Sequence, residues 1–478
     1  MKKDKINEGS DKRRMSKLEK ENAKLKAQNE RLKSDNKQLK SDLGKERKKK
    51  RRESNRTEQR TGTITLDPIE RYTYSGFMIM AALLFYVYVG VSCRQAVKSL
   101  KLINHLFNNQ LGKVPSYRSV NCWVAKAGLA SLKGSVKSLK EAYALIVDAS
   151  ISVGDQQLLL FLKIPAEHKG HALTHEDAEV AGMKVASSWP AEKVKEMAQG
   201  IIDSEERNPE YILSDNGANL RKATELLGIQ HHRDVSHTLA TYLKQVYEND
   251  EEYKMFSEQI AKTKHLALTD VAYLMPCKQR RMARFMNLYP IVDWASRMLA
   301  NFHNLTEKER FHYSFIQRSA SLISELGEVL SMFEQVMEIL KKEGLTFATA
   351  AKCKSIVQNA MLPAGRTVKL GELICSYLDQ ETKLLANACE KHNISSDIME
   401  SRFGLLKNKM PMCKAMGFTP SSLVLPLYSK MQGLGKVSQA QIVIWMKNTR
   451  VKDVKDWTNN NLKRNPLTMR REKLTQMA

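Results

Sequence analysis

The chain has 478 residues, with 77 Lys and Arg against 52 Asp and Glu, so its formal net charge is +25. A basic excess this large favours a polyanionic partner, nucleic acid first and an anionic membrane second. Its seven Cys form no C-x-x-C pair, which argues against a disulfide framework or a Cys-rich zinc module and for a reduced intracellular protein. The charged N-terminus lacks an apolar segment, so we expect no secretory signal.

The first 44 residues predict a parallel, leucine-zipper-like coiled coil. Leu recurs every seven residues there, at Leu18, Leu25, Leu32 and Leu39. Asn at three successive a positions favours a dimer in one register but weakens the zipper, and a solvated disordered arm is the alternative. Residues 45–66 include the basic run KERKKKRRESNRTEQR and are interpreted as a flexible linker that binds phosphate without sequence preference.

Residues 67–140 have a helical pattern. The apolar stretch Phe77–Val91 is shorter than the roughly 20 residues that a helix needs to cross a bilayer, so a buried core helix is favoured over a membrane segment. Ser92 is suited to cap a second helix that runs to about Phe107.

A third helix is predicted after Pro115, with Ser116 as its N-cap. Its apolar face is formed by Val120, Trp123 and Val124, and its first turns present Tyr117, Arg118 and Asn121 outward. A helix-turn-helix recognition helix offers its N-terminal outward residues to DNA bases. The pattern therefore indicates a helix-turn-helix-like DNA-binding domain, although a plain helical bundle has the same periodicity.

Residues 141–249 alternate between strand and helix patterns, which predicts an α/β domain with a mixed sheet. The expected strands are Leu145–Val147, Leu158–Leu162, Gly182–Ala186, Tyr211–Ser214 and His231–Arg233, and the expected helices are Ala191–Ile202 and Ala218–Leu227. Residues 250–390 are predicted to be helical throughout. A helix-bearing segment follows at 391–435, and residues 436–478 are interpreted as a basic C-terminal tail.

Three acidic residues stand in three different local contexts. Asp148 ends the apolar run Ala144–Val147, Asp215 ends Tyr211–Ser214, and Glu400 lies in the helical segment Ser396–Phe403. A buried strand end is a costly place for a carboxylate unless a cation meets it. Mg²⁺ prefers a few carboxylate oxygens together with water and phosphate, so the three acids indicate phosphodiester chemistry. For Asp215-Asn216-Gly217 a plain turn is the alternative.

The order of these motifs resembles a known family. Strand-Asp (IVDAS), strand-Asp (ILSDNG), D-x-x-H at Asp234–His237, a long helical block and a Glu-bearing helix (SSDIMESRFGLLKNK) follow one another. This resembles the DDE transposases of the RNase H-like, retroviral-integrase superfamily, of the bacterial insertion-sequence type with a C/D-x-x-H motif and an all-helical insertion before the Glu. The resemblance implies an RNase H-like α/β core, a mixed five-stranded sheet with helices, interrupted by an all-α insertion.

The resemblance also implies roles for individual residues. Asp148, Asp215 and Glu400 would hold two Mg²⁺ ions, for which Mn²⁺ can substitute, and His237 would lie beside them at the scissile phosphate. An ordinary helix-start histidine paired with Asp234 is the alternative for His237. Lys407, on the face of Glu400, would contact DNA phosphate. Arg280 and Arg281, in a basic run of the insertion, would also bind phosphate, with a solvated face as the alternative. Trp294 would stack on a flipped base, with core packing as its alternative.

The expected function is therefore a transposase, an endonuclease and strand transferase that acts on element ends and target DNA during transposition and recombination. It would work as a homodimer or higher oligomer, in the cytoplasm of a bacterium near the nucleoid, without a membrane partner. The alternatives are a non-catalytic DNA-binding regulator derived from a transposase, and an RNase H-like nuclease that acts on branched DNA.

Overall fold

The computed structural model describes Glu30 and residues 66–135, 141–205, 207–266, 271–276, 285, 288–360, 365–410 and 417–477. The predicted coiled coil (apart from Glu30) and nearly all of the basic linker lie outside the described residues, as do Arg280 and Arg281. The chain divides into two compact units, Met1–Thr65 and Leu66–Ala478. All that follows concerns the second unit.

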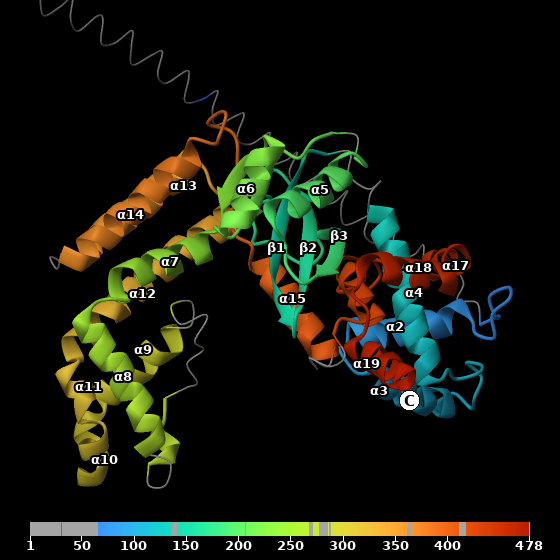
Figure 1. The fold of residues 1–478 in the computed structure, drawn as a ribbon, viewed down its shortest axis with the longest axis horizontal. Coiled ribbons are helices and arrows are strands. Elements are labelled where there is room, and N and C mark those ends of the chain that lie inside the picture. The colour runs from blue at the N-terminus through green and yellow to red at the C-terminus, as the bar shows by residue number, and fades with distance from the viewer. Residues whose placement is uncertain are drawn as a thin grey trace, which may run out of the picture. The chain divides into compact units, whose positions relative to one another are not determined.

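A mixed five-stranded sheet forms the centre of the α/β part, with strand order β3-β2-β1-β4-β5 (Figure 1). The strands are β1 (Tyr143–Val153), β2 (Gln156–Pro165), β3 (Glu179–Ala186), β4 (Tyr211–Ser214) and β5 (Gln230–Arg233). The first three strands pair antiparallel, whereas β4 runs parallel to β1 and β5 parallel to β4. Every predicted strand is present, and β1 to β3 extend beyond their apolar cores.

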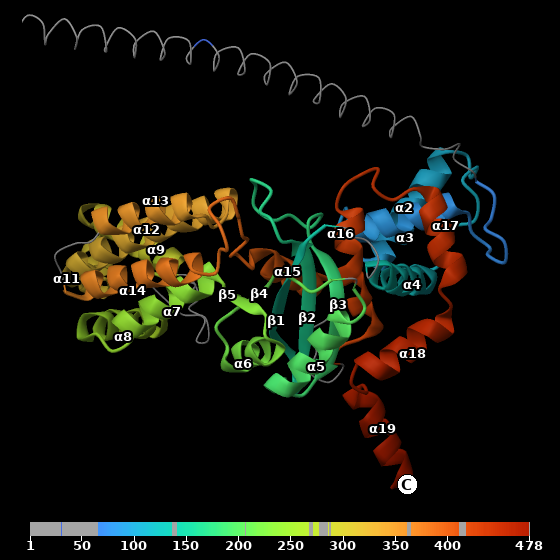
Figure 2. The ribbon, with the colours of Figure 1, turned by 90° about the horizontal axis from the view of Figure 1, so that it is seen from above.

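Each face of the sheet has its own apolar cluster, because alternate side chains of a strand point to opposite faces. On one face, Leu145 and Val147 of β1 pack with helices α5 (Ala191–Ile202) and α6 (Ala218–Leu227). On the other face, Ala144 and Ile146 join a larger cluster that includes residues of α4 (Tyr117–Ser135) and α15 (Asp397–Lys409). Figure 2 shows α5 and α6 on the side of the sheet away from α15. The predicted bounds of α5 and α6 are confirmed.

The helices before the sheet pack with helices from the end of the chain. They are α2 (Gly76–Val87), α3 (Cys93–Leu106) and α4, together with η3 (Pro420–Leu427), α16 (Tyr428–Met431), α17 (Gln439–Asn448) and α18 (Val451–Asn461). One cluster contains Trp123 of α4, Leu425 of η3 and Trp445 of α17. The segment interpreted as a basic tail therefore contains helices that help to build this core, and only α19 (Pro466–Gln476) has no buried residue.

The predicted caps of the first helices are confirmed. Ser92 forms a capping box with Gln95 at the start of α3, and Ser116 accepts a hydrogen bond from the Ser119 backbone N–H at the start of α4. Helix α2 ends at Val87, four residues before the end of the predicted apolar stretch. Among the described residues, no helix is both long and apolar enough to cross a membrane.

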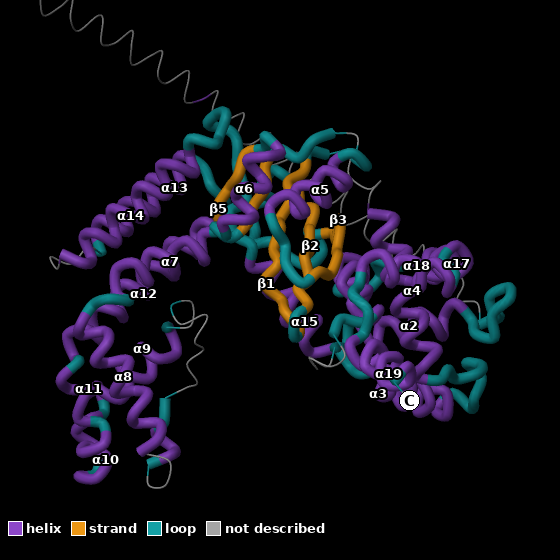
Figure 3. Tube along the Cα trace, viewed as in Figure 1, coloured by secondary structure: helices purple, strands orange, loops and turns teal. Residues whose placement is uncertain are grey.

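The helical insertion has a separate apolar core. Figure 3 shows its segment as helix and loop throughout the described residues. Its elements are α7 (Val235–Tyr247), α8 (Glu251–Leu266), η1 (Ala272–Leu274), α9 (Tyr289–Ala300), η2 (Phe302–Asn304), α10 (Glu307–His312), α11 (Ser314–Arg318), α12 (Ala320–Glu343), α13 (Phe347–Asn359) and α14 (Gly365–Thr382). Val235, Leu239 and Leu243 of α7 belong to this core. The insertion therefore begins at α7, earlier than the predicted residue 250.

Candidate active site on β1 and at the end of β4

Asp148 and Asp215 occupy equivalent positions on two neighbouring parallel strands. The β1–β4 register pairs Val147 with Ser214, and each Asp is the next residue of the chain. Asp215 directly follows the end of β4, whereas Asp148 lies inside β1, which continues to Val153. Asp148 is buried and Asp215 is half-buried. Ile146 and Leu213, two residues before each Asp, point to the face that α15 covers, so strand alternation directs both carboxylates to that face. The β1–β2 register shifts just after Asp148, where a bulge separates it from Ile151.

The structure also shows the alternative predicted for Asp215, a role in a local turn. The Asp215 carboxylate accepts a hydrogen bond from the Gly217 backbone N–H at 3.2 Å, and α6 begins directly afterwards. One carboxylate oxygen thus shapes the strand-to-helix turn. The two roles are compatible, since a carboxylate has about four acceptor positions.

Glu400 lies on α15, as predicted, and this helix packs on the same face of the sheet. Met399, Phe403 and Leu406 of α15 are buried in the cluster that contains Ile146 of β1. The Glu400 side chain is half-exposed, and its Oε1 lies 3.7 Å from Nε2 of His237. Partial burial raises the pKa of Glu400, and the nearby His237 offsets part of that increase.

Asp234 and His237, from the D-x-x-H motif, form a buried pair at the start of α7. Asp234 is fully buried, and its Oδ1 accepts hydrogen bonds from the His237 backbone N–H (2.8 Å) and from ring Nδ1 (2.9 Å). The alternative of a helix-start histidine paired with Asp234 is therefore observed. The ring also reaches toward Glu400, so the pair connects this helix start to the candidate site.

The electrostatics of this pair favour an imidazolium. Burial alone would lower the pKa of His237, but the hydrogen bond and charge of Asp234, reinforced by Glu400 and Asp215, raise that pKa to about 9. Burial would raise the pKa of Asp234, but its hydrogen bonds from His237 and Ser396 lower it. A protonated His237 thus lies among three carboxylates, where it can donate from Nε2 to an oxygen of a bound anion.

The second carboxylate oxygen of Asp234 holds the segment that leads into α15. Its Oδ2 accepts hydrogen bonds from the backbone N–H and the hydroxyl of Ser396, at 2.6 and 2.8 Å. In addition, the Val235 backbone N–H donates to the carbonyl of Ile394 at 3.0 Å. The contacts of Asp234 with Ser396 join residues that are 162 positions apart in the chain and place Glu400 opposite His237.

A buried network of histidines holds the chain at His392, a few residues before α15 begins. His232 of β5 contacts Glu381 of α14 through Nδ1 (2.8 Å) and His392 through Nε2 (2.9 Å). The ring of His392 stacks on Tyr211 of β4 at 4.5 Å between centroids. Burial, followed by the nearby His232, lowers the pKa of His392 to about 4. No local sequence pattern predicts this network, and its one sequence signal is the adjacent His231-His232 pair in a predicted strand.

Arg402, two residues after Glu400, was also missed. Its guanidinium is fully buried and donates to the carbonyls of Leu425 (2.6 Å) and His175 (2.9 Å) and to that of Ala178. Burial lowers the pKa of Arg402 to about 9. The residue fastens α15 to η3 and to the loop before β3. The sequence signal for a buried Arg402 is its position on the helix face that otherwise carries apolar residues.

The donor set fits Mg²⁺ by its chemistry, since three carboxylates are the oxygen ligands that this ion takes. The side chains of these three acids are not arranged as a metal site. Across the described residues, no group of three or more His, Cys, Asp or Glu is placed to hold a metal ion. The backbone places Asp148 within β1, Asp215 just after the neighbouring β4, and Glu400 on the helix that covers this face of the sheet.

The remaining predicted residues fall into two groups. Tyr117, Arg118 and Asn121 are exposed on the first turns of α4, and Lys407 is exposed on α15, seven residues after Glu400 and hence on the same helix face. Ten residues (107–116) join α3 to α4, more than the three to four of a tight helix-turn-helix. Trp294 is half-buried, donates to the Leu274 carbonyl at 2.9 Å and packs edge-on against Tyr313, which is the packing alternative.

A scan against protein-family models finds no family that matches this chain, and a search of curated proteins finds no similar sequence.

Proposed function

We propose that this protein is a DDE-type transposase with an RNase H-like core, which cleaves DNA strands at the ends of a mobile element and joins them to target DNA. The carrying observation is the placement of Asp148, within β1, and Asp215, directly after β4, one residue past the last paired residues of these parallel strands and on the face that the helix of Glu400 covers. The strand order β3-β2-β1-β4-β5, with three antiparallel and two further parallel strands, supports the RNase H-like assignment.

In this proposal Asp148, Asp215 and Glu400 would hold two Mg²⁺ ions, and the chemistry that such ions would supply is charge stabilisation of an in-line phosphoryl displacement. The protein's own groups position the DNA. His237, held by Asp234, donates from Nε2 to a phosphate oxygen at the edge of the site. Lys407, about 10 Å along α15 from Glu400 at 1.5 Å per residue, meets the next phosphates of the strand.

The test is strand cleavage and joining by the full-length protein with Mg²⁺, on the DNA ends that flank its gene. Asp148→Asn preserves shape but removes a charged ligand, so we expect cleavage and joining to fall by about a hundredfold or more while end binding persists. Asp203→Asn is the matched control, because Asp203 is exposed at the end of α5 on the other face of the sheet.

The outcomes separate this proposal from its alternatives. Binding of the ends without any cleavage by the unmodified protein would indicate a DNA-binding regulator. Cleavage of branched DNA without joining would indicate a nuclease of the same fold. An Asp148→Asn protein that cuts at the wild-type rate would overturn the catalytic assignment.

A further inference from the structure

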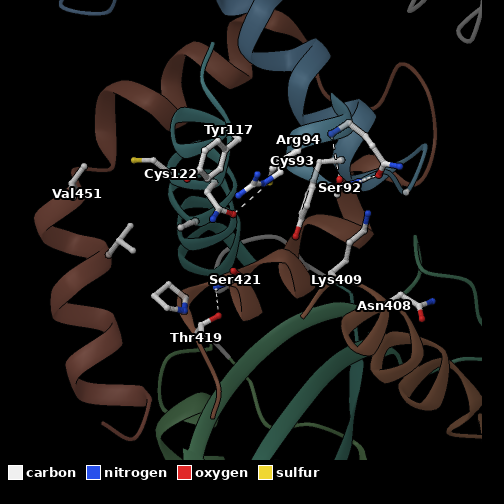
Figure 4. Close-up of a pocket in the computed structure, with 17 residues that line it drawn as sticks. Ser92, Cys93, Arg94, Tyr117, Cys122, Asn408, Lys409, Thr419, Ser421 and Val451 are labelled. Carbon is white, nitrogen blue, oxygen red and sulfur yellow. Dashed lines mark hydrogen bonds between the residues drawn. The ribbon is translucent and has the colours of Figure 1, made fainter. Parts of the chain in front are cut away.

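A cavity of about 820 Å³ lies between the helices that precede the sheet and those that follow it (Figure 4). Its size falls in the range of roughly 300–1,000 Å³ that is usual for small-molecule sites. Side chains reach it from α3 (Arg94), α4 (Tyr117, Asn121), the C-terminal end of α15 (Lys409) and α18 (Val454). It is therefore built from four segments that are far apart in sequence.

The charge of this cavity is positive. Its described lining includes Arg94 and Lys409 and no Asp or Glu. Lys409 is half-buried, its ammonium donates to the Val91 carbonyl at 2.9 Å, and it lies 4.5 Å from the centre of the Tyr86 ring. Burial lowers the pKa of Lys409. Within the part of the chain that the structure describes, no carboxylate is among the groups that shift the pKa of Lys409, so an anionic ligand would supply a counter-charge there.

The walls of the cavity combine this charge with apolar surface and hydrogen-bonding groups. The Arg94 guanidinium lies over the Tyr117 ring at 4.6 Å from its centroid, so the two groups form a cation–π pair with a flat, positively charged surface. Ala125, Pro420, Val451 and Val454 supply apolar surface, and Asn121, Thr419 and Ser421 supply donors and acceptors. A ligand that matches this lining has a flat ring with polar edges and a phosphate, which describes a nucleotide.

We propose that this cavity binds one unpaired deoxynucleotide of DNA, with its phosphate at Arg94 and Lys409 and its base between Tyr117 and the apolar wall. The identification of DNA as the source rests on the proposed function. Nine residues separate Glu400 from Lys409 on α15, which corresponds to about 13 Å at 1.5 Å per residue. Nine residues at about 100° each also place Lys409 about half a turn around α15 from Glu400, so the cavity lies on a different side of this helix from the candidate active site.

The first test is DNA binding in EDTA, where no metal-dependent cleavage occurs. Fluorescence anisotropy would compare a blunt duplex with the same duplex carrying a three-nucleotide single-stranded overhang. We expect the unmodified protein to prefer the overhang, and Arg94→Gln to reduce that preference about tenfold, the loss of one charge-assisted contact. Lys98→Gln, one helical turn further along α3, exposed and outside the cavity, removes the same charge and should preserve the preference.

The second test uses two cysteines that line the cavity. Cys93 and Cys122 are both half-buried there, whereas Cys389 is exposed outside it. Deoxyadenosine monophosphate and the overhang DNA should slow thiol labelling of Cys93 and Cys122, read by peptide mass spectrometry, and leave Cys389 unchanged. Equal protection by inorganic phosphate would show an anion site and overturn the nucleotide assignment, and so would a lack of protection by the nucleotide. Because neither test involves cleavage, their results are independent of the Asp148→Asn experiment.

Discussion

The carboxylate of Asp234 accepts two hydrogen bonds from Ser396, one from its backbone N–H at 2.6 Å and one from its hydroxyl at 2.8 Å. The same carboxylate caps α7 and holds the ring of His237 through its other oxygen. One buried side chain therefore fixes the start of the helix that bears Glu400 and the orientation of the histidine that faces Glu400.

Asp234→Asn should loosen this junction. The amide keeps one acceptor oxygen but replaces the other with a donor that faces existing donors, which leaves buried groups unpaired. We expect a loss of about 3 kcal/mol in the free energy of unfolding, measured by chemical denaturation. Asp456→Asn, at an exposed position of α18, is the control and should change stability by less than about 0.5 kcal/mol. Similar stabilities for the two variants would contradict the role assigned to Asp234.

His237 should make stability depend on pH in the alkaline range. Its folded-state pKa of about 9 lies above the ordinary value of 6.5, so its contribution is complete below pH 6.5 and is lost as the pH rises through about 9. Replacement by Gln removes the titrating group. The difference in unfolding free energy between wild type and His237→Gln should therefore shrink from pH 6.5 to pH 9.5. A constant difference across that range would show that His237 is neutral in the folded protein.

Arg402→Lys should destabilise the protein although it retains the charge. A lysine ammonium cannot reach the carbonyls of Leu425, His175 and Ala178 together, because it lacks the branched geometry of a guanidinium. We expect a loss of about 3 kcal/mol or more in unfolding free energy. The same change at Arg221, which is exposed on α6, should be nearly neutral. An equally small change in unfolding free energy at both positions would contradict the anchoring role of Arg402.

Gly128 permits a close approach between α4 and η3. A Cβ at this position would lie 1.8 Å from the carbonyl oxygen of Leu423, whereas one at Gly134, on the same helix, would meet nothing within 4 Å. Gly128→Ala should therefore cost about 1–3 kcal/mol through displacement of the helix. Gly134→Ala should be neutral or stabilising by up to about 1 kcal/mol, since Ala favours helix. Thermal unfolding of both variants tests the contact, and a neutral Gly128→Ala would argue against it.

Local sequence patterns predicted much of the α/β part. The helices Ala191–Ile202 and Ala218–Leu227 and the strand Tyr211–Ser214 have the predicted bounds, because their apolar periodicity and flanking turn residues are encoded within short windows. The neighbouring positions of Asp148 and Asp215 also follow from two apolar runs that each end in Asp, once β1 and β4 pair, although β1 continues past Asp148 to Val153.

Long-range packing decided the rest. Short windows do not encode which distant segments meet, so the sequence left open that α17 and α18 pack against α4, and that α7 belongs to the core of the insertion. The same holds for the buried contacts of His232, His392 and Arg402, whose burial depends on partners more than a hundred residues away or on another element. Composition and periodicity thus determined the main helices and strands and the acids that they carry or precede, whereas tertiary contacts through Asp234 and Arg402 determined where the helix of Glu400 lies.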